Sequence, residues 1–150
     1  MSLAGLDVVE AASLAGVLQG VGVEASDVEA GGAGLSLVRF ISDVWTVVNA
    51  LMLGAGLEGG RLRRVSVEYG VVDGLPWARA YLLVDGVLFY LYAKPSIDVF
   101  DVDLAVDEAG DAAERLHAEE FVPLVAGYEY TWDAERYAAG INVETIHLGH

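Results

Sequence analysis

Three residues in the C-terminal third of the sequence have side chains that could carry acid–base or metal chemistry. Glu114 and His117 are three residues apart, so a helix would place the carboxylate and the imidazole on one face. Glu120 follows three residues later and could add a further ligand. Di-iron bundles use a Glu-x-x-His spacing, but they need two copies and further glutamates, and this sequence has one copy. The alternative is a solvated acidic helix face, in which His117 meets only the charges of its neighbours.

The densest run of carboxylates lies just before these residues. It contains Asp98, Asp101, Asp103, Asp107 and Glu108. An EF-hand loop beginning at Asp101 is excluded, because its sixth residue is Val106 where glycine is needed and its twelfth is Ala112 where glutamate is needed. On a strand, Asp101 and Asp103 would share one face and could hold a divalent cation, or they could be the solvated side of an edge strand.

Other reaction types find little support. The sequence has no cysteine, which excludes disulfides, thiol catalysis and zinc–thiolate sites within the chain. It has no G-x-S-x-G motif, although a triad assembled in space stays open. The glycines from Gly54 to Gly60 follow a predicted helix and precede a predicted strand, the reverse of a phosphate-binding loop. No cofactor is therefore predicted.

The strongest structural signal is a β-hairpin at residues 77–94. Asp85 and Gly86 separate two runs rich in β-branched and aromatic residues, which is typical of a type I′ turn with positive φ at both positions. A two-residue loop fixes the register, with Val84 opposite Val87, Leu82 opposite Phe89 and Arg79 opposite Tyr92. Both faces are too apolar for water to cover, so we expect both to be packed against protein.

One face of this hairpin is rich in tyrosine and arginine. It carries Arg79, Tyr81, Leu83, Leu88, Tyr90 and Tyr92. Tyr and Arg are enriched in protein–protein contacts, so these six residues are candidates for a binding interface. The alternatives are a face covered by the chain's own helices and a face that lines a ligand pocket.

The remaining segments complete a predicted α+β fold in a single domain of residues 1–150, with an antiparallel meander sheet of three to five strands packed against two to four helices. Glycines make residues 20–34 a loop or an irregular strand. Helices are predicted at Leu3–Leu18, from a Ser36 cap to Gly54 or Gly56, at Asp107–Val122 and at Trp132–Ala139; further strands are predicted at Arg61–Gly70, Ile97–Leu104 and Ile141–Leu148.

The composition is unusually apolar for a soluble chain. Hydrophobic residues make up 55% of the sequence, against roughly 45–50% in typical domains. A buried subunit interface would explain the surplus, most simply in a C₂ homodimer. The alternative explanation is a codon bias toward Val, Leu and Ala. Scarce Asn and Gln fit a thermophilic source or the same bias.

Charge is distributed unevenly along the chain. The net charge is −15, but residues 61–94 carry five bases against three acids, whereas residues 95–150 carry two bases against thirteen acids. The overall acidity predicts that neither nucleic acid nor an anionic membrane is a partner, and it allows a basic protein partner. The N-terminus lacks the pattern of a signal peptide, so a cytoplasmic location is expected.

Two functions fit these observations. The first is a non-catalytic, homo-oligomeric interaction or scaffold domain that uses the Tyr/Arg face of the hairpin. The second is a small enzyme or small-molecule-binding protein, with Glu114, His117 and Glu120 in a pocket near the aromatic segment 128–137. A His117 buried beside a carboxylate would favour the second function, and an exposed His117 would favour the first.

Overall fold

The computed structural model describes residues 36–149. Residues Asp43–His150 form one compact unit, and the described residues before Asp43 belong to another, so the unit that contains the sheet is described by itself. The predicted helix Leu3–Leu18 and the predicted loop at residues 20–34 lie outside the described residues. A single domain over residues 1–150 stays a prediction.

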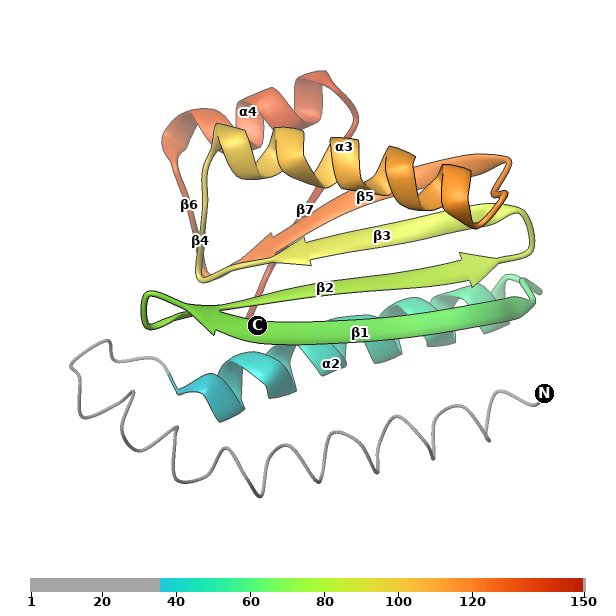
Figure 1. Ribbon diagram of the computed structural model, residues 1–150, viewed down its shortest axis with the longest axis horizontal. Coiled ribbons are helices and arrows are strands. Elements are labelled where there is room, and N and C mark those ends of the chain that lie inside the picture. Colours follow the sequence, from blue (N-terminus) through green and yellow to red (C-terminus); the bar gives the residue numbers. More distant parts are fainter. Residues whose placement is uncertain (1–35, 150) are drawn as a thin grey trace. The chain divides into compact units, whose positions relative to one another are not determined.

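The described helices and strands form an α+β arrangement, as predicted (Figure 1). The elements are α2 (Leu37–Leu57), β1 (Leu62–Val72), β2 (Leu75–Val84), β3 (Val87–Ala93), β4 (Ser96–Ile97), α3 (Val99–Arg115), β5 (Glu120–Gly127), β6 (Glu129–Tyr130), α4 (Trp132–Gly140) and β7 (Glu144–His147). Ser36 caps α2 as expected, because its Oγ accepts a hydrogen bond from the Arg39 backbone N–H at 3.4 Å.

The main sheet has the strand order β1-β2-β3-β5-β7. The first three strands form the predicted antiparallel meander, and the predicted register of β2 on β3 is confirmed at all three pairs, including Arg79 opposite Tyr92. The predicted turn is only half confirmed: Asp85 has φ +54°, but Gly86 is not among the residues with positive φ. Beyond β3 the sheet is parallel, since β5 pairs with β3 and β7 pairs with β5.

The helix α3 begins earlier than predicted, and two predictions are corrected here. Residues 97–104 were expected to form a strand, with a helix following at 107–122. Instead, a capping box starts α3 at Val99: the Asp98 side chain accepts from the Asp101 N–H and the Asp101 side chain accepts from the Asp98 N–H, both at 2.9 Å. The helix ends at Arg115, and Pro123 lies within β5 at a position before the pairing with β7 begins.

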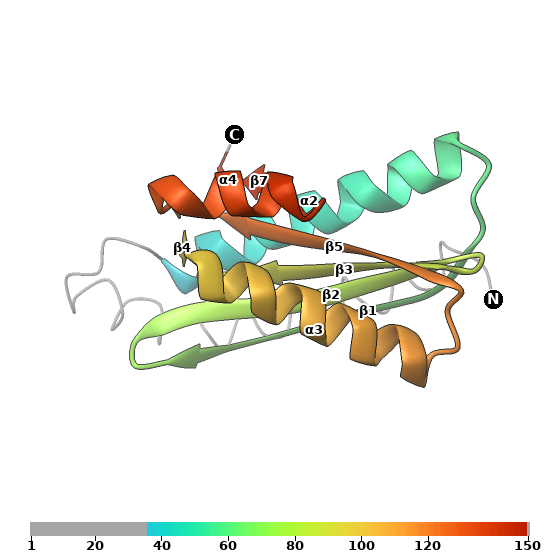
Figure 2. The same cartoon turned by 90° about the horizontal axis from the view of Figure 1, so that it is seen from above.

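Small side chains allow α3 to lie close to the sheet. Its buried face is mostly alanine, at positions 105, 109, 112 and 113. These alanines pack with Leu88 and Tyr90 toward one end of β3 and with Tyr92 and Val125 toward the other. α3 packs against β3 and β5, and Figure 2 shows the loop between β1 and β2 extending past the first turn of α3. The α3 side of β1 and β2 is therefore less covered than that of β3.

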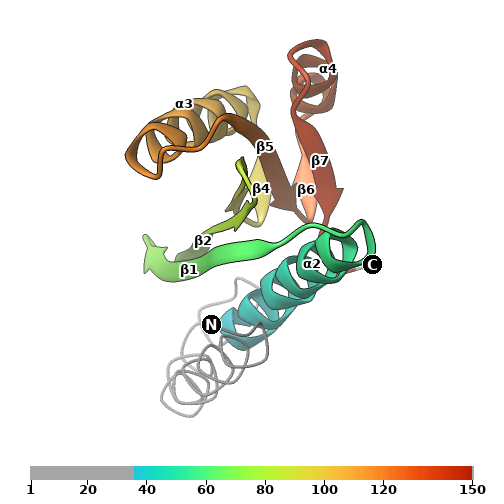
Figure 3. The ribbon, with the colours of Figure 1, turned by 90° about the vertical axis from the view of Figure 1, so that its right-hand side faces the viewer.

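On the opposite side of the sheet lies the part of α2 within this unit, residues 43–57 (Figure 3). The Tyr128 hydroxyl donates a hydrogen bond to Asp43 Oδ2 at 2.5 Å, which links this helix to the segment after β5. By length and composition α2 could cross a membrane, but core helices of soluble proteins have the same properties. Val44 and Val48 are buried, as in a core helix.

The packing around Gly127 gives a first test of the fold. An added Cβ there would lie 2.7 Å from Ile97 Cγ1 and 2.9 Å from the Lys94 carbonyl oxygen, whereas a Cβ at Gly54 in α2 would meet nothing within 4 Å. We expect Gly127→Ala to lower the free energy of unfolding by about 1–3 kcal/mol. Gly54→Ala should leave it unchanged or raise it by up to about 1 kcal/mol. Urea denaturation measures both, and equal stability of the two variants would contradict this packing.

Tyr130 gives a second test, through pH. Its hydroxyl donates to the Ile146 carbonyl at 2.5 Å and accepts from the Ile146 N–H at 3.1 Å. Burial raises the pKa of Tyr130 from 10.0 to about 12, so the folded state holds the phenolic proton more tightly than the unfolded state. This stabilisation is complete below pH 10 and is lost as the pH rises to about 12. Urea denaturation across this range should show a fall in stability that is smaller in Tyr130→Phe; equal falls would contradict the assignment.

Candidate functional site

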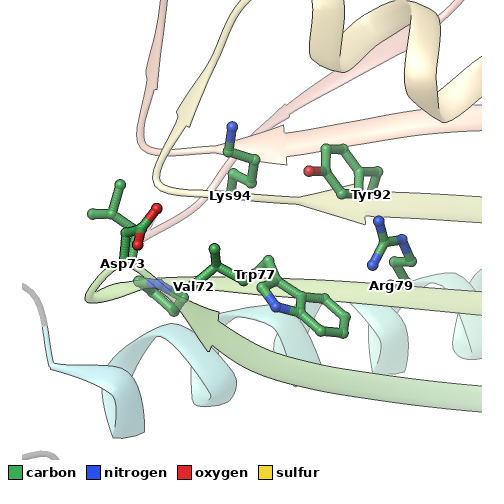
Figure 4. A pocket seen from close by; sticks show the side chains of 8 residues that line it. Val72, Asp73, Trp77, Arg79, Tyr92 and Lys94 are labelled. Atoms are coloured by element: carbon green, nitrogen blue, oxygen red, sulfur yellow. The ribbon is translucent and has the colours of Figure 1, made fainter.

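A pocket of about 450 Å³ opens between the end of the β1–β2 hairpin and β3 (Figure 4). It is lined by Val72, Asp73, Leu75, Pro76, Trp77, Arg79, Tyr92 and Lys94. This volume is within the range of about 300–1,000 Å³ that is typical of small-molecule sites. The pocket therefore has the size for an organic ligand and combines two cations with two aromatic rings.

The hairpin geometry explains how these side chains come together. Asp73 and Gly74 form its turn with φ +53° and +77°, the left-handed backbone that a two-residue type I′ loop needs. Alternation along β2 then places Leu75, Trp77 and Arg79 on one face of the sheet. Because Arg79 pairs with Tyr92 across the two strands, the Tyr92 side chain of β3 lies on this same face beside Arg79.

Arg79 is the most heavily contacted side chain in the pocket. Its guanidinium carbon lies 4.7 Å from the centre of the Trp77 ring and 5.3 Å from that of the Tyr92 ring. Its Nε donates a 2.7 Å hydrogen bond to Glu108 Oε1 on α3. This hydrogen bond raises the pKa of Arg79 further, so the side chain stays cationic.

Tyr90 shares the same carboxylate. Its hydroxyl donates to Glu108 Oε1 at 2.8 Å. Burial, and then the hydrogen bond to Glu108, raise the pKa of Tyr90, because ionisation would place a second negative charge beside the first. The phenol therefore remains a donor and helps to hold Glu108 in position for Arg79.

Lys94 is the second cation and the only lysine of the sequence. Its Nζ lies 3.0 Å from Asp101 Oδ1, and Asp101 is only 7% exposed. Burial lowers the pKa of Lys94, but the hydrogen bond and the charge of Asp101 outweigh that effect and raise the pKa above its ordinary value. Lys94 is therefore also a fixed cation.

Trp77 is held by a close approach to β1. An added Cβ on Gly70, the cross-strand partner of Trp77, would lie 2.8 Å from the Cζ2 atom of the indole. Only glycine leaves space for the ring at this position. The indole therefore lies against the β1 backbone, with the Arg79 guanidinium near its ring.

Arg79 also lines a second, smaller depression of about 220 Å³. The residues around it are Ser66, Glu68, Arg79, Ala80, Tyr81, Tyr90 and Arg115. Asp101, Glu108 and Arg115 follow one another at intervals of seven residues, so they lie along one side of α3. The two depressions thus follow the boundary between α3 and the open part of the sheet.

The six predicted interface residues are divided by this boundary. Leu88, Tyr90 and Tyr92 on β3 are buried, and all three pack in the core clusters that α3 forms. These three side chains are not accessible to a second copy of the chain. On β2, Arg79, Tyr81 and Leu83 are partly exposed. The face thus combines two of the alternatives considered above, cover by the chain's own helix and a ligand pocket.

The predicted acid–base residues are not brought together. Glu114, His117 and Glu120 are all exposed. The helix ends before His117, whose φ is +55°, and Glu120 begins β5, so the helical spacing is lost. Within residues 36–149, no group of three His, Cys, Asp or Glu side chains could hold a metal ion.

The predicted aspartate pair also separates. Asp101 contacts Lys94, and Asp103 accepts a hydrogen bond from the Tyr137 hydroxyl of α4. Because both residues lie on a helix and not on a strand, they point in different directions.

Trp77, Lys94 and Glu108 were not predicted as site residues, and Asp101 was predicted only as a candidate ligand of a divalent cation. The sequence did contain a signal for Lys94. It continues the alternation of Tyr90 and Tyr92 just past the end of β3, so its side chain is expected on the same face as theirs. The two carboxylates lay in a segment predicted partly as a strand, so their common helix stripe could not be recognised.

Comparison with known proteins gives little further information. No family model and no curated protein matches the chain. A solved structure, "Structure of EndoMS in apo form", has a TM-score of 0.43 and 15% identity. The match covers 68% of this chain and 45% of the other, so the chain spans less than half the length of that protein. This degree of likeness assigns no activity to the chain.

One prediction about partners is nevertheless corrected. Nucleic acid was excluded because the whole chain is acidic, and that exclusion is withdrawn. The physical reason that the exclusion fails is that net charge is a property of the whole chain. Residues 61–94, which contain all eight residues that line the pocket, carry more bases than acids.

Glu108 provides the test of the site's architecture. We expect Glu108→Gln to lower the free energy of unfolding by about 1.5–3 kcal/mol, because charge-assisted hydrogen bonds to Arg79 and Tyr90 are lost. Glu114→Gln is the matched control, since Glu114 is exposed on the same helix, and it should change the stability by less than about 0.5 kcal/mol. Urea denaturation distinguishes the two; equal effects would show that Glu108 does not hold the site together.

Proposed function

We propose that the chain is a binding protein for a small oxyanion, a phosphate or a carboxylate, held between Arg79 and Lys94. The observation that carries the proposal is that two fixed cations line one pocket, each held by a carboxylate of α3. Arg79 lies in β2 and Lys94 directly follows the end of β3, and a rigid sheet positions charged groups more accurately than a loop does.

The donors that remain on both cations support this proposal. Glu108 engages Nε of Arg79, and among residues 36–149 no hydrogen bond is formed by its two Nη groups. The planar guanidinium fork matches the geometry of a carboxylate or a phosphate. The Lys94 ammonium has three N–H donors, of which Asp101 takes one.

The two α3 carboxylates also limit the affinity. Glu108 and Asp101 already neutralise part of the charge that an anion would meet, and Asp73 lies on the pocket wall. We therefore expect dissociation constants of roughly 0.1–10 mM for simple oxyanions, and weaker binding as salt is added. Weak binding of a fragment is compatible with tighter binding of a ligand that fills the pocket.

The structure favours this function over the two functions considered from the sequence. The acid–base residues Glu114, His117 and Glu120 are exposed and not enclosed by a pocket. The scaffold function relied on a sheet face that α3 partly covers. The oxyanion pocket uses two members of that face, Arg79 and Tyr92, in a different role.

A titration with methyl phosphate, followed by two-dimensional amide NMR, tests the proposal. Shifts should concentrate at residues 72–79 and 92–94. Lys94→Gln should weaken binding about tenfold or more, because one direct charge contact is lost. Lys94→Arg, which keeps the charge, should bind within about threefold of the original protein.

The matched control is Arg63→Gln, which removes the same charge at an exposed position of β1 and should leave the affinity unchanged. A short single-stranded oligonucleotide forms a further arm, since its phosphodiesters present the same class of oxyanion. Shifts scattered over the surface, or equal affinity in Lys94→Gln and Arg63→Gln, would refute the proposed site.

A further inference from the structure

We infer that the pocket selects oxyanions that carry a planar apolar ring, with Leu75 and Trp77 as the residues that determine this specificity. The inference rests on the proposed function. It concerns the half of the pocket that the oxyanion would leave empty. A pocket of about 450 Å³ is much larger than a phosphate or a carboxylate group alone.

The two cations and the exposed apolar side chains line different parts of the pocket. Arg79 lines it from β2 and Lys94 from the end of β3, whereas Val72 and Leu75 flank the β1–β2 turn at Asp73 and Gly74. These two apolar side chains remain largely in water, at 61% and 51% exposure. A ligand that covers them would remove apolar surface from water, which favours binding.

Trp77 lies between the two halves and provides a planar surface. The β1 backbone at Gly70 leaves space for the ring, and Arg79 lies near it, so the indole is already ordered before a ligand arrives. An ordered aromatic side chain costs little further entropy on binding. Aromatic rings prefer edge-to-face or offset contacts with one another, which favours a planar ring over a flexible alkyl chain at this position.

Three phosphate monoesters with the same charged group provide the experiment: methyl, butyl and phenyl phosphate. We expect phenyl phosphate to bind about tenfold more tightly than methyl phosphate, with butyl phosphate between them. Ring-current shifts should appear at the Trp77 indole N–H with phenyl phosphate and not with methyl phosphate.

Two variants test the specificity residues. Leu75→Ser should reduce the preference for phenyl over methyl phosphate to below about threefold while leaving the affinity for methyl phosphate unchanged. Leu57→Ser is the matched control, because Leu57 is also an exposed leucine, in α2, and should keep the full preference. Gly70→Ala, which displaces the indole, should also reduce the preference.

The outcomes separate the two proposals. Failure of all three esters to bind would overturn the proposed function. Binding of methyl phosphate without a gain for phenyl phosphate would overturn the specificity and leave the oxyanion site intact. Equal affinity of butyl and phenyl phosphate would overturn the requirement for a planar ring. A phenyl preference that survives both Leu75→Ser and Gly70→Ala would place the ring outside this half of the pocket.

Discussion

Alanine side chains at the contact between α3 and the sheet determine which part of the sheet is covered. A helix with alanine at positions 105, 109, 112 and 113 can approach the backbone of β3 and β5 closely, and it buries Leu88 and Tyr90 beneath it. Larger side chains at these four positions would move α3 away from the strands. The extent of the open face on β1 and β2, and therefore the position of the pocket, depends on this contact.

Polar contacts along one edge of the same helix then fix the site. Asp101 and Glu108 are two helical turns apart; Glu108 contacts Arg79 of β2, and Asp101 contacts Lys94 directly after β3. The capping box that begins α3 also uses Asp101, so the residue that starts the helix is the one that holds Lys94. The same carboxylate therefore starts the helix and positions Lys94. A substitution at Asp101 would affect both the capping box with Asp98 and the pocket.

Elements formed by local interactions could be predicted from the sequence, and elements formed by long-range contacts could not. Turn residues and alternation are local, and they were sufficient for the hairpin register, down to Arg79 opposite Tyr92. The α3 region was ambiguous, because Phe100, Val102 and Leu104 alternate like a strand, and only the reciprocal cap of Asp98 and Asp101 decides for a helix. The parallel pairing of β3 with β5 is a long-range contact that no local pattern encodes. The same limit applies to the site, since Glu108 and Arg79 are 29 residues apart.

The net charge of the whole chain differs from the charge that surrounds the pocket. The net charge of −15 describes the field at long range, where salt screens it within about 10 Å. In the proposed function an anion in the pocket would contact Arg79 and Lys94 directly, and the two ion pairs with α3 fix both cations without using all of their donors. An acidic protein can therefore hold an anion if its carboxylates position its few cations, and here the acidic helix α3 has that role. Two residues of the acidic segment, Asp101 and Glu108, thereby hold two of the five bases of residues 61–94.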